Sequence, residues 1–201
     1  MLVEGEGEVH AAGNLIARLS ADLGLQLHWA PPIRWPNLHC KDAVERGASF
    51  IRSKPDAELL LILRDEDDGC PKDLGPRTAE WVRQLNLPFP AAVVLLNPEY
   101  EVLFLPCIDK IRGKHLDGRP GLQADAEWVA DSFEAHRGVK EWLTQQFPRN
   151  RTYKPTLDQL PMTRMLDFAT LRSSGLSCFG TLERALSFLN QSTGQNGVYP
   201  S

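Results

Sequence analysis

The 201-residue sequence has few cysteines, no long apolar segment and no excess of positive charge. Its four cysteines are widely spaced, with no C-x-x-C pair and no cluster of cysteine and histidine, which argues against a structural zinc site. We expect the thiols to be free or buried, as in a reducing compartment. The five histidines are scattered as well, and none of them is assigned a role.

No apolar run approaches the roughly 18–20 residues that a membrane-spanning helix needs, and we expect no signal peptide before the first motif. We therefore expect a cytoplasmic protein without a membrane partner. The net charge of −4 gives no overall electrostatic footprint for nucleic acid. A metal-free group of carboxylates would itself lower the net charge. The value of −4 therefore does not exclude a metal-dependent enzyme that acts on nucleic acid.

The segment Leu59–Asp68, LLLILRDEDD, joins an apolar run to a cluster of carboxylates. Such a run is typical of a strand buried on both faces, here over Glu58–Arg64. If strand geometry continues, Asp65 and Asp67 point to the same side and repel each other unless a cation lies between them. Mg²⁺ suits such a pair because it prefers oxygen ligands. Alternatively, the acidic run is a solvated loop or a helix N-cap.

Acidic residues follow two other predicted strands. Glu4 follows Leu2–Val3, and Glu8 lies in the first turn of a helix expected from about Val9 to Gly24. Glu99 and Glu101 follow a buried strand over Ala91–Leu96. Because parallel strands bring their carboxyl ends to one edge of a sheet, where α/β proteins bind ligands, we predict a shared carboxylate site. Glu8 has another explanation, since a carboxylate is favourable at a helix N-terminus without any metal.

Strands that alternate with helices predict an α/β fold with a mainly parallel sheet flanked by helices. Residues 1–110 are expected to form the metal-binding α/β core, and residues 111–201 a mainly helical extension packed on it. A short strand is considered at Leu25–Trp29, and the tail after Asn190 is expected to be frayed. The helices expected beyond the first are Lys41–Ser53, Pro76–Leu87, Asp125–Ala135, Val139–Gln146, Leu157–Leu171 and Thr181–Leu189.

The order of these motifs is similar to the Toprim fold, which topoisomerases, primases and the overcoming-lysogenisation-defect (OLD) nucleases share. Its signature is a glutamate after the first strand and Asp-x-Asp after a later one, matched here by Glu4 and by Asp65-Glu66-Asp67. The nuclease branch reads VEG-x-x-E, which makes Glu8 the second glutamate. The resemblance further implies an acid after the next strand, from Glu99 or Glu101, and an assisting lysine. Lys154, in the basic loop 147–155, is the best-placed candidate for that lysine, although such loops are more often solvated surface.

The whole chain also looks like a family of small Toprim-like proteins. The segments that carry this resemblance are Glu4–Glu8, Asp65–Pro71, Glu99–Glu101 and Tyr153–Asp158. The resemblance implies metal-dependent cleavage of DNA or RNA, often beside an ATPase partner and in defence against phage.

The expected mechanism uses two Mg²⁺ or Mn²⁺ ions about 3.5–4 Å apart to assist phosphodiester hydrolysis. Glu4, Glu8, Asp65 and Asp67 would hold one ion, with Asp65 bridging to a second ion that Glu99 or Glu101 helps to hold. Lys154 or Arg151 would neutralise charge on the phosphate.

Two other functions remain. One is a non-catalytic partner or regulatory subunit of an ATPase complex, for which the lack of a basic track for DNA is an argument. The other is nucleotidyl transfer as in primases, which the missing Walker-type glycine loop disfavours.

Overall fold

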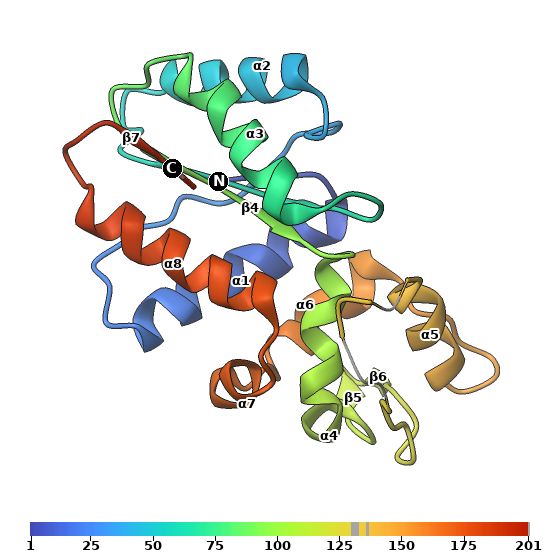
Figure 1. Ribbon diagram of the computed structural model, residues 1–201. Coiled ribbons are helices and arrows are strands. Elements are labelled where there is room, and N and C mark those ends of the chain that lie inside the picture. The colour runs from blue at the N-terminus through green and yellow to red at the C-terminus, as the bar shows by residue number, and fades with distance from the viewer. Residues whose placement is uncertain (130–132, 136, 201) are drawn as a thin grey trace.

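The computed structural model describes residues 1–129, 133–135 and 137–200 (Figure 1). A five-stranded sheet lies at its centre, and every neighbouring pair of strands is parallel. Its strands are β1 Leu2–Val3, β2 Ile33–Arg34, β3 Leu60–Asp65, β4 Pro90–Leu96 and β7 Gly197–Tyr199, in the order β2-β1-β3-β4-β7. The predicted α/β class, with a parallel sheet flanked by helices, is confirmed.

Helices cover both faces of this sheet. The α-helices are α1 Glu6–Asp22, α2 Lys41–Arg52, α3 Pro71–Arg83, α4 Ile108–Ile111, α5 Val139–Gln146, α6 Leu160–Thr163, α7 Phe168–Ser173 and α8 Ser177–Gln191. A 3₁₀ segment, η1 Tyr100–Cys107, a π-helical turn, η2 Pro155–Gln159, and the antiparallel pair β5 His115–Leu116 and β6 Arg119–Pro120 complete the chain. Helices α2 and α3 lie on one side of the sheet, and α1 and α8 lie on the other (Figure 1).

The apolar run of β3 is explained by this double cover. Leu61 and Leu63 pack into the core beneath α1 and α8, whereas Leu60 and Ile62 pack into the core beneath α2 and α3. All four are fully buried. Since alternate strand residues face opposite sides of a sheet, a strand covered on both sides needs apolar residues at every position.

Three helices begin earlier than predicted, among them α8, which begins at Ser177 rather than Thr181. Helix α1 begins at Glu6 rather than near Val9, so Glu8 lies inside its first turn. Helix α3 begins at Pro71 rather than Pro76. Proline suits the first helical position, where its missing N–H has no partner to lose, so Pro71 was the correct start signal and Pro76 lies within the helix.

Short strands were the least predictable elements. No strand forms over Leu25–Trp29; β2 at Ile33–Arg34 pairs with β1 instead. The tail expected to be frayed contains β7, which pairs with β4 from Pro90 to Ala92. Strands of two or three residues carry too little periodicity to be found in a sequence, and they form here because a neighbouring strand offers free hydrogen-bonding groups.

In the later third, α5 has the predicted bounds, Val139–Gln146. The helix expected over Asp125–Ala135 is not formed at residues 125–129, and part of its range lies outside the described residues. The helix expected over Leu157–Leu171 is divided into η2, α6 and α7. Asp167 causes the last division, because its side chain accepts the Thr170 N–H at 2.9 Å and caps α7.

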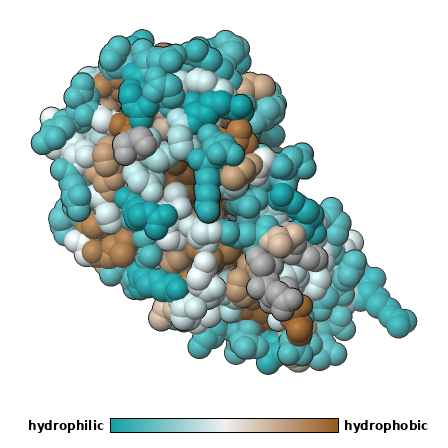
Figure 2. All heavy atoms as spheres, viewed as in Figure 1, coloured by the Kyte–Doolittle hydropathy of each residue, from teal (hydrophilic) through white to brown (hydrophobic). Residues whose placement is uncertain are grey.

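The division of the chain at residue 110 stays a prediction, although β7 and α8 from the second part contribute to the main layers. Within the described ranges, no helix combines the length and apolarity needed to cross a membrane. The face in Figure 2 is mostly polar, with apolar residues in separate small patches.

Candidate metal centre

The carboxyl ends of β3 and β4 meet at the centre of the site. Asp65, the last residue of β3, is in register with Leu96, the last residue of β4. Asp65 Oδ1 accepts the backbone N–H of Tyr100 at 2.8 Å, which ties the two strand ends together. One carboxylate oxygen from each of Asp65, Glu99 and Glu101 lies within 4.8 Å of the others. These three residues, called here the carboxylate group, include one residue after β3's apolar run and two after β4, as expected.

Glu101 is the most enclosed member of the carboxylate group. Its side chain is fully buried, and its Oε1 accepts hydrogen bonds from Tyr153 Oη at 2.7 Å and from Gln159 Nε2 at 3.1 Å. Its Oε2 accepts no hydrogen bond from the described residues. Burial, opposed by the charge of Lys140 and reinforced by Asp65, raises the pKa of Glu101 to about 7.

Lys140, in the first turn of α5, supplies a positive charge at the centre of the group. Its Nζ lies 2.7 Å from Glu99 Oε2, 3.4 Å from Glu101 Oε2 and 3.5 Å from Asp65 Oδ2. Its backbone N–H also donates to Glu99 Oε1 at 2.9 Å. Burial disfavours the charged ammonium, but Glu101 and Asp65 outweigh that effect and hold the pKa of Lys140 above its usual value.

Glu8 adds a fourth carboxylate, from the first turn of α1. Glu8 is buried, with 5% of its surface exposed, and its Oε2 has no hydrogen-bond partner among the described residues. Burial is the main cause that raises the pKa of Glu8 to about 7; the Gly5 N–H opposes this and the charge of Glu101 adds to it. Burial, together with Glu8, likewise holds the pKa of Asp65 well above its ordinary value. The charges of Glu8 and of the carboxylate group therefore repel one another.

Three of the predicted ligands lie outside the carboxylate group: Glu8, described above, Glu4 and Asp67. The side chain of Glu4 is turned to the loop before α2, where its Oε1 accepts the Leu38 N–H at 2.6 Å and lies 3.9 Å from His39 Nδ1. Asp67 is exposed. β3 ends at Asp65, so the alternation of a strand does not fix the direction of Asp67. Burial and, next, the charge of Glu99 raise the pKa of Asp67, whereas Lys140 opposes this, so Asp67 interacts with the carboxylate group.

The remaining acid of the motif has a structural role. Glu66 is buried, pairs with Arg64 at 2.7 Å and accepts the Gly69 N–H at 2.9 Å. These contacts close the turn that follows β3, while the Glu66 N–H still donates to the Leu96 carbonyl of β4 at 2.8 Å. Of Asp65-Glu66-Asp67, the first aspartate is therefore a member of the carboxylate group, and Glu66 belongs to the turn that follows it.

Lys154, the lysine expected to assist, is exposed, and no ion pair within the described residues joins it to the carboxylate group. Its backbone N–H donates to Asp158, and Arg151 is ion-paired with the same aspartate. The lysine in contact with the carboxylates is Lys140. Sequence reasoning predicted the helix that carries Lys140, but nothing in the sequence signals that its first turn reaches the end of β4.

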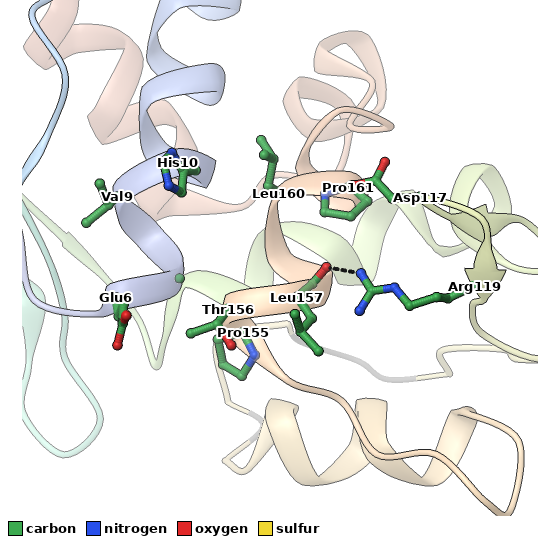
Figure 3. Close-up of a pocket in the computed structure, with 11 residues that line it drawn as sticks. Glu6, Val9, His10, Asp117, Arg119, Pro155, Thr156, Leu157, Leu160 and Pro161 are labelled. Atoms are coloured by element: carbon green, nitrogen blue, oxygen red, sulfur yellow. Dashed lines mark hydrogen bonds between the residues drawn. The ribbon is translucent and has the colours of Figure 1, made fainter.

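A pocket of about 520 Å³ lies beside the site, between α1, the η2–α6 segment and the β5–β6 pair (Figure 3). Arg119 reaches across its rim and donates to the Leu157 carbonyl at 2.6 Å. Gly7 closes its inner side, because a Cβ there would lie 2.6 Å from Gln159 Oε1 and 2.7 Å from the Pro155 carbonyl carbon. Gln159 in turn donates to Glu101 Oε1 at 3.1 Å, so the residue packed against Gly7 also holds a member of the carboxylate group.

Comparison with known proteins adds no family, since no protein-family model, no curated protein and no solved structure matches the chain. The chemistry of the site is therefore argued from its own residues. Four carboxylates with one lysine, close to the edge of a parallel sheet, form an oxygen-rich site suited to a hard divalent cation.

Proposed function

We propose that this protein is a divalent-metal-dependent nuclease that hydrolyses phosphodiester bonds of DNA or RNA. The observation that carries the proposal is the carboxylate group, whose three ligand oxygens lie within 4.8 Å of one another at the carboxyl end of β3 and β4. Ligand sites of open α/β sheets lie at this edge. The Toprim-like order of the acidic motifs supports the same activity and suggests an ATPase partner and a role in defence against phage.

The residues fit a divalent ion by a test independent of the motif. Glu8 Oε2 is a buried oxygen without a hydrogen-bond partner among the described residues, close enough to Glu101 for the two charges to raise the pKa of Glu8. A buried carboxylate oxygen left unpaired costs free energy, and a cation would remove that cost. Mg²⁺ and Mn²⁺ suit the all-oxygen donor set, which has no histidine or cysteine among its members.

Asp65, Glu99 and Glu101 would hold the ion, with Glu8 as the fourth carboxylate. A bound divalent ion would supply Lewis-acid stabilisation of the phosphate and a lower pKa for an attacking water. Tyr153 and Gln159 hold the Glu101 carboxylate in one orientation, and the Tyr100 N–H does the same for Asp65. Preorganised ligands of this kind need no rearrangement when charge develops on the phosphate.

The grouping supports one ion more directly than two. A second ion would need a ligand beyond the carboxylate group and Glu8, and Glu4 and Asp67 are the nearest candidates in the sequence motifs. Glu4 would have to leave the Leu38 N–H, whereas Asp67 is already close enough for Glu99, after burial, to raise its pKa. We keep the two-ion mechanism as part of the proposal for the substrate-bound enzyme.

Cleavage of labelled DNA and RNA in the presence of Mn²⁺ tests the proposal. Asp65→Asn should abolish cleavage, because it removes a ligand charge from a site where the backbone bond to Tyr100 can remain. Asp56→Asn is the matched control, since Asp56 is exposed in the loop before the opposite end of β3. Equal Mn²⁺-dependent cleavage by wild type and Asp65→Asn would refute the assignment.

A non-catalytic subunit of an ATPase complex is the second candidate, and Lys140 is the observation that favours it. Its ammonium already neutralises part of the carboxylate group without any metal. In that case the folded protein would bind no divalent ion, and neither nucleic acid would be cleaved when the ATPase partner is present.

A further inference from the structure

The position of Lys140 suggests how a cation enters the site. Its Nζ is within 3.5 Å of one oxygen from each member of the carboxylate group, Asp65, Glu99 and Glu101. These are the same three residues whose oxygens are close enough together to ligate an ion. We infer that the Lys140 ammonium and the divalent ion are alternative occupants of one cation position. The lysine side chain then leaves this position when the ion binds. This inference rests on the proposed metal site.

The argument begins with space and charge. A hard divalent ion binds carboxylate oxygens at about 2.0–2.6 Å, so an ion shared by the three carboxylates takes up the volume that the ammonium fills. Two cations in contact would also repel each other strongly in a site shielded from water. The carboxylate group can therefore hold the lysine or the ion, and not both in the same place.

The lysine is the partner that is free to move. Glu101 is fully buried and held by Tyr153 and Gln159, and Asp65 is held by the Tyr100 N–H. The Lys140 side chain is 37% exposed, so its ammonium has a path to solvent. Its backbone N–H bond to Glu99 does not depend on where the side chain points, which lets α5 stay in place.

The ammonium is also an incomplete substitute for the ion. Among the described residues, Lys140 forms ion pairs with the carboxylate group but none with Glu8, whose Oε2 is buried without a hydrogen-bond partner. A divalent ion carries twice the charge and accepts more oxygen ligands than a lysine has N–H groups. The unpaired oxygen of Glu8 therefore favours the ion, while proximity and covalent attachment favour the lysine.

Mn²⁺ affinity of the full chain, measured by calorimetry without substrate, tests the inference. Lys140→Met keeps most of the side-chain volume and removes the competitor. If the lysine fills the position about nine-tenths of the time, its removal should tighten Mn²⁺ binding about tenfold, since apparent affinity scales with the free fraction of a site. Lys154→Met is the matched control, because that lysine is exposed and unpaired with the carboxylates, and it should bind Mn²⁺ as wild type does.

Equal or weaker binding by folded Lys140→Met would overturn the inference and leave the metal site itself intact, provided that wild type binds Mn²⁺ and Asp65→Asn does not. Binding by Lys140→Met alone would support the inference in its strongest form. Absence of binding in wild type and in folded Lys140→Met would refute the proposed metal site, and the inference with it.

A second measurement needs no variant and covers the case in which Lys140→Met does not fold. The rate at which acetic anhydride modifies Lys140 in wild type is followed by mass spectrometry, with Lys154 as the internal reference. Saturating Mn²⁺ should raise the rate at Lys140 relative to Lys154, because the expelled ammonium is exposed and freed from its carboxylates. An unchanged or slower rate at Lys140 would contradict displacement.

Discussion

Lys140 holds both carboxylate oxygens of Glu99: its backbone N–H donates to Oε1 at 2.9 Å, and its Nζ lies 2.7 Å from Oε2. A single residue thus joins the first turn of α5 to the end of β4. The carboxylate satisfies an N–H that the helix leaves without a partner, and it also neutralises the lysine. The later part of the chain is fixed to the sheet at the candidate metal centre itself.

Glu99→Ala should therefore destabilise the metal-free protein, by about 1–2 kcal/mol for the loss of a charge-assisted hydrogen bond and a helix-capping contact. Urea-induced unfolding measures this change. Glu141→Ala, an exposed carboxylate in the same helical turn, is the control and should change the free energy of unfolding by less than half as much. Equal effects of the two substitutions would show that the contact between Lys140 and Glu99 adds no stability.

The free energy of unfolding of the metal-free protein should depend on Glu8 and pH. The pKa of Glu8 is about 7 in the folded protein and has an ordinary value of 4.5. The folded state therefore holds the proton more tightly than the unfolded chain. The stabilisation is complete below pH 4.5 and is lost as the pH rises through about 7.

Comparison with Glu8→Gln isolates this contribution, because other titrating groups are shared. Between pH 5 and pH 8, wild type should lose stability relative to Glu8→Gln, as measured by urea unfolding at each pH. A constant difference between the two proteins across this interval would contradict a raised pKa at Glu8.

Mn²⁺ binding should strengthen between pH 5 and pH 8, whereas the stability of the metal-free protein falls over that interval. Glu8 and Glu101, both with a pKa of about 7, must lose their protons before they ligate a metal ion. Mn²⁺ should consequently raise the melting temperature more at pH 8 than at pH 6. Calorimetry in two buffers with different ionisation enthalpies should detect protons released on binding at pH 6, and the absence of release would count against these carboxylates as ligands.

Gly7→Ala tests the packing that supports Glu101. The added Cβ would lie 2.6 Å from Gln159 Oε1 and 2.7 Å from the Pro155 backbone, so η2 must shift. We expect a loss of about 1–3 kcal/mol in the free energy of unfolding, as for other overpacked sites, and weaker Mn²⁺ binding because Gln159 orients Glu101. Gly75→Ala, a helical glycine whose Cβ would meet only an ordinary contact at 3.8 Å, should not destabilise. Similar unfolding curves for the two variants would contradict the close approach.

The sequence predicted the position of a site residue best where that residue follows a long, buried strand. The apolar runs of β3 and β4 have side chains buried on both faces of the sheet, and this pattern located Asp65, Glu99 and Glu101 at one edge. The positions of Glu4, Asp67 and Lys140 depend on loop geometry instead. Glu66 turns the chain after Asp65 through its bonds to Arg64 and Gly69, and Lys140 reaches Glu99 across 41 residues of sequence. Neither contact has a periodic signal in the sequence.

The central claim is that the carboxylate group binds a divalent cation, and Mn²⁺ titration of wild type against Asp65→Asn tests it without requiring turnover. Calorimetry and thermal unfolding are followed together, with Asp56→Asn as the control. We predict that wild type and Asp56→Asn bind Mn²⁺ and gain thermal stability, whereas Asp65→Asn does neither while remaining folded. Equal binding and equal stabilisation of wild type and Asp65→Asn would contradict the account.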